Sequence, residues 1–338
     1  MKNPNIFFYA TSELSQDAFI CWLLDWARPE LAQVDGLLNS CAKYLIGRFF
    51  AKHGLRIPDS IKTVNVRRQA SNIDVLCEVN GEYVILIEDK TATKNHSGQL
   101  LRYLEKVQAM GVDREKVVPI YLKTFDQSCY KKVNEDGYKE FVREDLIEVL
   151  NFGIGLGVTN AIFTDFYEHL CGISERVDSY LTEPVEGWSR KPLAWVGFYK
   201  WAQKSLGSGT WDYVANPSGG FMGFWWAFQE TAFGKLYLQL EENRLCIKIK
   251  VDAQNGTERR KTRTIVFDAL KKQLADIDSR FARPARFGSG KYMTLLVCEG
   301  YLKADGNGVV DLESTLVGLK RAEAALKDLH LTEPSCTE

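Results

Sequence analysis

The chain has 338 residues, 45% of them hydrophobic, which is enough for two domains that each bury a core. The formal net charge is only −1, so the chain is not a globally basic coat for nucleic acids, although a local basic patch can still contact phosphates. The eight cysteines form no C-x-x-C pair and only four histidines occur, which argues against a zinc ribbon or an iron–sulfur cluster.

Helical and strand-like segments alternate in the first half of the chain. A first helix is predicted over residues 11–27, capped by Thr11 or Ser12, and a second over residues 34–53, ending at Gly54. The segments that follow read β, β, β, α, β, at residues 61–69, 73–79, 83–88, 99–110 and 117–122. Residues 138–150 and 160–181 have a helical pattern and are expected to flank the sheet.

The third predicted strand ends in a run of charged residues. Residues 83–87 are apolar on both faces, which indicates a buried central strand, and Glu88, Asp89 and Lys90 follow directly. Glu88 and Lys90 are two residues apart, so both side chains leave the same face of the strand. Charges on strands often form cross-strand ion pairs on a solvated face, but charges at the end of a buried strand favour a functional site.

The helix after this strand carries a pair of polar side chains on one face. Gln99 and Tyr103 stand at i, i+4 spacing, which brings them together on the helix surface. The pair also fits an ordinary helix surface with a half-buried tyrosine. His96, which precedes them, is interpreted as a loop or helix-cap residue rather than a ligand.

Taken in this order, the residues resemble the PD-(D/E)XK nuclease superfamily. The match consists of an acidic residue, an E-x-K element and a Q-x-x-x-Y element typical of the RecB-like branch: Asp74, Glu88-Asp89-Lys90, and Gln99 to Tyr103. Ile73 takes the place of the proline in the family name, which leaves the neighbouring carboxylate in position. The resemblance implies an α/β chain with a restriction-endonuclease-like αβββαβ core, which matches the order of the predicted elements, and the pattern of the second half predicts a C-terminal α+β module.

The resemblance also implies a metal site. Asp74, Glu88 and the carbonyl of Asp89 would hold Mg²⁺, with Mn²⁺ as a substitute, because hard oxygen ligands suit these ions. Lys90 would orient the attacking water or stabilise developing charge. Such a site hydrolyses phosphodiester bonds by activating water beside the scissile phosphate.

Three more residues are assigned to catalysis by the same resemblance. Gln99 and Tyr103 would contact the nucleophile or the scissile phosphate from the helix. In this superfamily a glutamate of the first helix often completes the site, and Glu13 is the candidate. Glu13 also fits a plain first-turn acid that interacts favourably with the helix dipole.

A shared metal constrains the hairpin between the second and third strands. A two-residue turn at Asn80-Gly81 pairs Val79 with Glu82, which leaves Asp74 and Glu88 on opposite faces. A three-residue loop shifts the pairing by one residue and sets Asp74 opposite Glu88. We therefore predict the three-residue loop, with Gly81 or its neighbour at positive φ.

A linker is expected at residues 182–187, and the part of the chain after it differs in composition from the part before it. Six of the eight tryptophans lie from Trp188 to Trp226, among several glycines. Helices are predicted at residues 191–205, 266–281 and 311–329, and strands at 221–230, 235–241, 244–250 and 293–297. The glycine- and tryptophan-rich passage can be a hydrophobic core or a surface on which bases stack; we favour the core.

Basic residues gather in two runs of this second half. One covers residues 259–263, and the other is spread over Arg280, Arg283, Arg286 and Lys291. Each run alone suggests a solvated loop, but two in one module favour a surface that contacts phosphates.

We interpret the chain as a Mg²⁺-dependent nuclease domain, residues 1–183, and a C-terminal α+β module for substrate or partner selection, residues 188–331. The expected partner is nucleic acid, with DNA favoured over RNA, and a homodimer is possible. A role in restriction or phage defence fits such nucleases. The alternatives are a catalytically silent nuclease fold that binds nucleic acid or protein, and an effector nuclease gated by a signal. No signal-peptide segment or transmembrane run is visible, so we expect a cytoplasmic protein without membrane partners.

Overall fold

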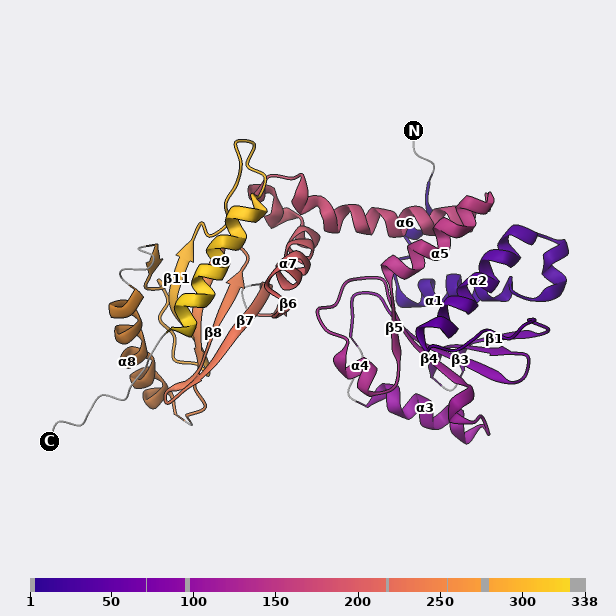
Figure 1. Cartoon of the computed structure of the whole chain (residues 1–338), viewed down its shortest axis with the longest axis horizontal. Coiled ribbons are helices and arrows are strands. Elements are labelled where there is room, and N and C mark those ends of the chain that lie inside the picture. Colours follow the sequence, from indigo (N-terminus) through magenta and orange to yellow (C-terminus); the bar gives the residue numbers. More distant parts are fainter. Residues whose placement is uncertain are drawn as a thin grey trace. The chain divides into compact units, whose positions relative to one another are not determined.

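The structure is a computed structural model of the whole chain. It describes residues 4–70, 72–94, 98–216, 219–253, 255–274 and 280–328, so His96 lies outside the described residues. The chain divides into two compact units, Met1–Glu175 and Arg176–Glu338 (Figure 1). The division falls within helix α6, Ala161–Asp178. The last three residues of the linker expected at residues 182–187 belong to a short 3₁₀ helix, Val185–Arg190.

The first unit contains a five-stranded sheet in the order β1-β2-β3-β4-β5. Its strands are β1 Val64–Ala70, β2 Ile73–Val79, β3 Tyr83–Lys90, β4 Val117–Lys123 and β5 Lys139–Val142. β1, β2 and β3 pair antiparallel, whereas β3, β4 and β5 pair parallel. The helices are α1 Glu13–Asp25, α2 Gly36–Lys52, α3 Gln99–Ala109, α4 Lys131–Glu135, α5 Arg143–Leu156 and α6.

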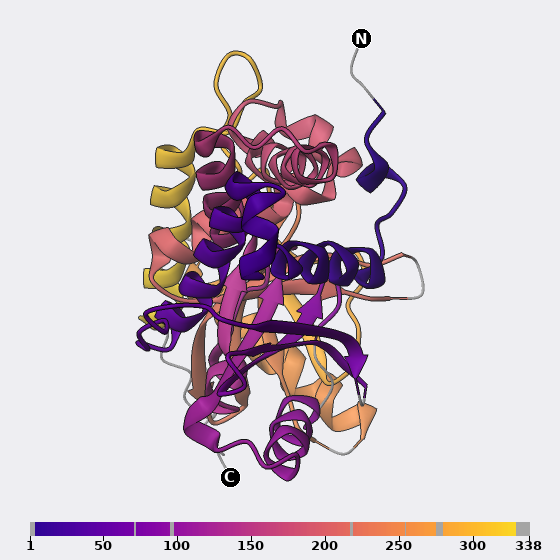
Figure 2. The same cartoon turned by 90° about the vertical axis from the view of Figure 1, so that its right-hand side faces the viewer.

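Strand β3 is the centre of this sheet and is covered on both faces. Figure 2 shows α1 on one side of the sheet and α3 on the other. Val84 and Leu86 pack with Leu100 and Leu104 of α3, and the alternate residues of β3 face α1. All its residues after Tyr83 are buried, as the apolar sequence predicted. The αβββαβ order expected from the sequence is confirmed.

The β2–β3 hairpin has the predicted three-residue loop. Val79 is paired with Tyr83, so residues 80–82 form the loop, and Asn80 and Gly81 have φ of 58° and 64°. The Asn80 side chain accepts a hydrogen bond from the backbone N–H of Lys62 at 2.7 Å and donates to the carbonyl of Ser60 at 2.9 Å. These bonds to the segment before β1 hold Asn80 in the left-handed conformation, which asparagine adopts more readily than most residues.

One predicted helix of this unit is wrong at its start. The sequence predicted a helix over residues 138–150, but residues 139–142 form β5 and the helix begins at Arg143. The strand forms because it pairs with β4, with Ile120 opposite Lys139, and such a partner is not visible in the local sequence. The short helix α4 was not predicted.

The second unit contains a six-stranded antiparallel sheet in the order β10-β11-β9-β8-β7-β6. Its strands are β6 Thr210–Val214, β7 Phe221–Thr231, β8 Gly234–Glu241, β9 Arg244–Lys250, β10 Phe281–Ala282 and β11 Tyr292–Glu299. Its helices are α7 Pro192–Leu206, α8 Gly256–Leu274 and α9 Leu312–Lys327. All elements predicted for this half occur, and β6 and β10 were missed.

The tryptophan-rich passage mainly builds the core of this unit. Trp188, Trp195 and Trp226 are almost completely buried in one cluster with residues of α7, α8 and α9, as we favoured from the sequence. Helix α8 begins ten residues earlier than predicted and ends before Phe281, which belongs to β10. Asn255 explains the early start, because its side chain accepts a hydrogen bond from the N–H of Glu258 at 2.8 Å.

The basic run at residues 259–263 lies on α8, so its interpretation as a loop is wrong. The Arg263 guanidinium is buried, donates to the carbonyl of Phe287 at 2.7 Å and lies over the Phe287 ring. Arg259 donates to the carbonyls of Ser289 and Ala253. Two arginines of the run therefore anchor the segment that precedes β11.

Candidate active site

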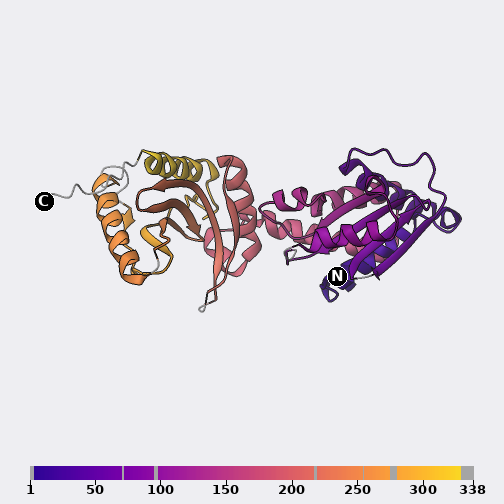
Figure 3. The ribbon, with the colours of Figure 1, turned by 90° about the horizontal axis from the view of Figure 1, so that it is seen from below.

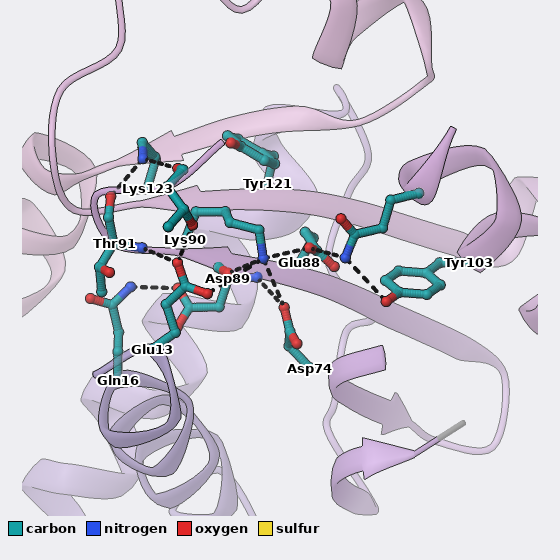
Figure 4. Close-up of polar contacts among 12 residues, drawn as sticks. Glu13, Gln16, Asp74, Glu88, Asp89, Lys90, Thr91, Tyr103, Tyr121 and Lys123 are labelled. Carbon is teal, nitrogen blue, oxygen red and sulfur yellow. Dashed lines mark hydrogen bonds and ion pairs between the residues drawn. The ribbon is translucent and has the colours of Figure 1, made fainter. Parts of the chain in front are cut away.

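The side chains that follow the buried part of β3 converge on one ammonium group. Lys90 Nζ lies 2.6 Å from Glu88 Oε1 and 2.8 Å from the carbonyl oxygen of Asp89 (Figure 4). Asp74 Oδ2 and Glu13 Oε2 each lie 3.7 Å from the same nitrogen. Four oxygen donors from β2, β3 and α1 thus surround one cation at the carboxyl end of β3.

The backbone conformation positions the carboxylates around Lys90. The three-residue loop places Asp74 of β2 beside the end of β3, where its Oδ2 accepts a hydrogen bond from the N–H of Asp89 at 2.9 Å. Glu13 is the first residue of α1, after the cap Ser12, and its Oε1 accepts from the N–H of Thr91 at 3.2 Å. The structure therefore brings Glu13 into the cluster instead of leaving it as a solvated first-turn acid.

Gln99 and Tyr103 join the same cluster from α3. Gln99 Nε2 donates to Glu88 Oε1 at 2.6 Å and to Tyr103 Oη at 3.1 Å. Gly98, at φ 70°, precedes the helix and lets the chain turn so that Gln99 opens α3 against β3. Tyr103 packs in the core beneath α3, so the pair is more than an ordinary helix surface.

Only the backbone of Asp89 contributes to the site. Its side chain points to the opposite face of β3, is buried, and accepts a hydrogen bond from Gln16 of α1. Gln16 in turn accepts from the Thr124 hydroxyl at 2.7 Å. Asp17 is also buried on this side, and burial together with the charge of Asp74 raises its pKa to about 6.

Gln16, Asp17 and Lys123 were not identified from the sequence. Gln16 and Asp17 stand three and four residues after Glu13, so a helical projection from Glu13 could have found them. Lys123 is the last residue of β4 and lies opposite Lys90 in the parallel register. Parallel neighbours end at the same edge of a sheet, which was the available signal.

Lys123 holds the segment that leaves β3. Lys123 is 1% exposed, and its ammonium donates to the carbonyl of Thr91 at 2.6 Å and to that of Thr93. Burial lowers the pKa of Lys123 to about 8. The Thr93 hydroxyl donates to Glu13, so Lys123 supports the same loop that positions this glutamate.

The ionisation of the cluster follows from burial and mutual charge. Burial, with a further contribution from Asp74, raises the pKa of Glu88 to about 7. Burial alone would lower the pKa of Lys90, but the charge and hydrogen bond of Glu88 outweigh it and raise the pKa. For Glu13, burial is outweighed by the hydrogen bond from Thr93 and the charge of Lys90, and the pKa is lowered. Lys90 is therefore the positive centre of an otherwise acidic site.

The donor set suits a hard divalent ion. Among the described residues, no three His, Cys, Asp or Glu side chains are grouped as ligands of one ion, and the oxygens here surround the Lys90 ammonium. Glu88 Oε2 is buried and makes no hydrogen bond, so it keeps free lone pairs. Two carboxylates and a carbonyl, completed by water and phosphate oxygens, are what Mg²⁺ usually takes in proteins. The residues present fit such an ion.

Comparison with known protein families identifies the superfamily of this chain. The family model of the PD-(D/E)XK nuclease superfamily matches residues 4–179, more than half of the chain, and the chain belongs to this superfamily. Its sheet and flanking helices are the restriction-endonuclease-like fold that the family implies. No curated protein and no solved structure matches the chain. In the described part of the chain, no helix is long and apolar enough to cross a membrane.

Proposed function

We propose that the protein is a Mg²⁺-dependent nuclease that hydrolyses phosphodiester bonds, with DNA as its substrate. The observation that carries the proposal is the cluster of oxygen donors around Lys90 at the end of a buried strand. Burying charged groups costs free energy, so a buried cluster of charges calls for a functional reason. Catalysis gives that reason, because the groups occur in the order typical of a nuclease family.

Asp74, Glu88 and the carbonyl of Asp89 would hold the ion, because their oxygens already face one point. A bound divalent ion supplies a water of lowered pKa and neutralises charge on the phosphate. Lys90, which carries a positive charge in this setting, orients the attacking water or stabilises the extra charge on the phosphoryl oxygens.

Gln99, Tyr103 and Glu13 complete the proposed site. Gln99 fixes the Glu88 carboxylate through its amide, and Tyr103 accepts a hydrogen bond from Gln99 and offers its hydroxyl to a phosphate oxygen. Glu13 restrains the segment after β3 and faces Lys90. The Gln99–Tyr103 pair supports placing the chain in the RecB-like branch.

Further features of the proposal rest on the family and on composition. We propose a nuclease domain over residues 1–183 and a substrate- or partner-selection module over residues 188–331, in a cytoplasmic protein that acts in restriction or phage defence. The family match from residue 4 to 179 supports the first boundary. DNA rather than RNA is chosen because DNA is the common substrate of similar nucleases.

A direct assay tests the proposal. Purified protein is incubated with linear and with circular DNA in the presence of Mg²⁺, Mn²⁺ or EDTA. Cleavage is expected with either metal and not with EDTA, and cleavage of circular DNA identifies endonuclease action. RNA of the same sequence serves as the competing substrate, and preferential cleavage of RNA would contradict the choice of DNA.

Variants connect the activity to the site. Asp74→Asn and Lys90→Ala are each expected to lower the cleavage rate by about a hundredfold or more, as removal of one charged catalytic group typically does. The matched control is Glu78→Gln, which changes a carboxylate on the same face of β2 four residues away. Parental activity in Asp74→Asn or Lys90→Ala would show that the site is misassigned, and a catalytically silent fold would show no metal-dependent cleavage at all.

A further inference from the structure

The sheet of the second unit has one face that its helices do not cover. Leu236, Leu238 and Leu240 of β8 point into the core that α7, α8 and α9 complete. Figure 3, with Figure 1, shows α9 lying along one face of this sheet. The side chains between these leucines, Tyr237 and Gln239, therefore point to the opposite face.

That opposite face carries a hollow of about 610 Å³ with aromatic walls. Its aromatic lining residues are Phe221, Trp225, Phe228, Tyr237 and Tyr292, from strands β7, β8 and β11. Phe228 and Tyr292 are 51% and 60% exposed. The volume lies within the range of about 300–1,000 Å³ found for ligand sites.

A β-bulge brings one of these rings into place. The register between β7 and β8 shifts by one residue between Trp226 and Gln229, and Ala227 has φ of 53°. The extra residue turns Phe228 to the open face, where strict alternation would have sent it to the core. Its ring stacks on that of Tyr237, with centroids 5.3 Å apart. The strand thus departs from regular geometry to expose an aromatic ring.

Three lysines lie beside the aromatic rings. Lys235, Lys248 and Lys250 line the same hollow, and Lys235 lies directly opposite Lys250 on β8 and β9. Like charges in directly opposite positions destabilise a sheet unless anionic groups lie beside them. Tyr292 is the next residue across, opposite Lys250 on β11.

Two of these lysines are available to an incoming anion. The carboxylate partners of Lys235 and Lys250 are Glu230 and Asp252, whose side chains are 74% and 64% exposed. Such surface ion pairs contribute little, so a phosphate can replace the carboxylates. Lys248 differs, because it is paired at 2.6 Å with Glu241 and both side chains are nearly buried.

We propose that this hollow binds unpaired nucleotides of a DNA strand. Bases stack on Trp225, Phe228 and Tyr292, and the phosphates between them contact Lys235 and Lys250. Only unpaired bases present their faces to aromatic rings, so the surface selects single-stranded segments over intact duplex. The Gln239 amide, held by Glu241 Oε1 at 3.1 Å in the floor of the hollow, faces the edges of the bases. The choice of DNA as the strand rests on the proposed function.

The test measures binding without cleavage. Fluorescein-labelled oligo(dT) and a blunt duplex are titrated with the full-length chain in EDTA, and fluorescence anisotropy is recorded. Phe228→Ala combined with Tyr292→Ala is expected to weaken oligo(dT) binding by about tenfold or more, as loss of stacked bases typically does. Both rings are exposed, so the variant should keep its thermal midpoint. Tyr213→Ala is the matched control, because Tyr213 is 55% exposed and does not line the hollow.

The lysines are tested through salt dependence. Lys235→Gln with Lys250→Gln is expected to flatten the salt dependence of oligo(dT) binding by roughly 0.7 units of slope per lost contact. Lys327→Gln, which removes an exposed, paired lysine of α9, should leave the slope unchanged. Unchanged affinity in the aromatic variant, or an unchanged slope in the lysine variant, would overturn the proposal.

Two other results would also overturn it. Competition by free dTMP as effective as that by oligo(dT) would identify a nucleotide pocket, and loss of self-association in the aromatic variant without loss of DNA binding would identify a protein interface. Failure of this proposal is separable from failure of the nuclease assignment. If the parent cleaves DNA and the variants bind it as tightly as the parent does, the proposed binding surface is wrong and the nuclease assignment stands. If the parent does not cleave DNA but the variants bind it more weakly, the nuclease assignment is wrong and the binding surface stands.

Discussion

The two sheets of this protein place their polar groups in opposite settings. β3 of the first sheet is buried on both faces, and the Lys90 at its end is 7% exposed among carboxylates. The open face of the second sheet keeps Lys235 and Lys250 beside exposed carboxylates in water. Buried charges depend on one another, because each lacks water as an alternative partner, whereas exposed charges act nearly independently. Substitutions should therefore have large, coupled effects in the first setting and small, separate ones in the second.

The largest effect is expected for Lys90→Met in the metal-free protein. This change leaves the buried Glu88 carboxylate without its cation, which should lower the free energy of unfolding by about 3 kcal/mol or more. Mg²⁺ should raise the thermal midpoint of the variant more than that of the parent, because the ammonium and the ion compete for the same oxygens. Differential scanning fluorimetry with EDTA and with Mg²⁺ measures both effects.

Lys116→Met is the control for this change. Lys116 also pairs with a glutamate, Glu82, but in an exposed position. A much smaller loss than in Lys90→Met is expected, as for other surface ion pairs. Equal losses in the two variants would show that burial does not couple the charges at the end of β3.

The next effect concerns pH and Lys123. Its pKa in the folded chain is about 8, below the usual 10.5, so ionisation of this lysine opposes folding. Above pH 10.5 Lys123 is neutral in the folded and the unfolded chain, so its stabilising contribution is fully present. This contribution is lost as the pH falls from 10.5 through 8. Relative to Lys123→Met, the parent should thus lose up to about 3 kcal/mol between pH 10 and pH 7. Urea unfolding at the two pH values measures this, and parallel pH profiles would contradict it.

A smaller effect separates the arginines of α8. Arg263→Met removes the hydrogen bond to the carbonyl of Phe287, and should cost about 2 kcal/mol in urea unfolding without changing the salt dependence of DNA binding. Arg260 is exposed on the same helix, and Arg260→Met should leave stability unchanged. A flatter salt dependence in Arg263→Met would return this arginine to the phosphate-contacting surface that the sequence suggested.

The smallest effect is expected for Tyr103→Phe. The change removes the hydroxyl that accepts from Gln99 but leaves the bond between Gln99 and Glu88. The loss of one hydrogen bond corresponds to about 1 kcal/mol, or about a fivefold slower cleavage. Gln99→Ala frees Glu88 and should slow cleavage more. Single-turnover rates with Mg²⁺ measure both, and the reverse order would place Tyr103 rather than Gln99 against the reacting groups.

Much of the first unit could be predicted from local patterns. The apolar run of β3 marked the central strand, and the charges after it marked the end where the polar cluster forms. Parity alone predicted the three-residue loop, since Asp74 and Glu88 could share a face only with an odd number of loop residues. The helical spacing of Gln99 and Tyr103 correctly predicted that they contact each other.

The missed strands share one cause, which is that each is short and depends on pairing with a neighbouring strand. β5 looked helical until β4 paired with it, and β10 is a two-residue strand that exists only beside β11. β6 was missed in the same way, beside β7. Strand formation depends on neighbouring strands more than helix formation depends on neighbouring helices, because every ladder hydrogen bond of a strand ends on another strand, whereas helix hydrogen bonds stay within the helix.

The order of the elements, the hairpin register and the charged residues after β3 could be read from the amino-acid sequence alone. These follow from period, turn chemistry and spacing, which act over a few residues. Three features depend on the packed fold: Gln16 donates a hydrogen bond to Asp89, Lys123 supports the segment after β3, and Phe228 faces outward. Each depends on which elements pack together, and the cost of burying an unpaired polar group then selects the contacts that remain.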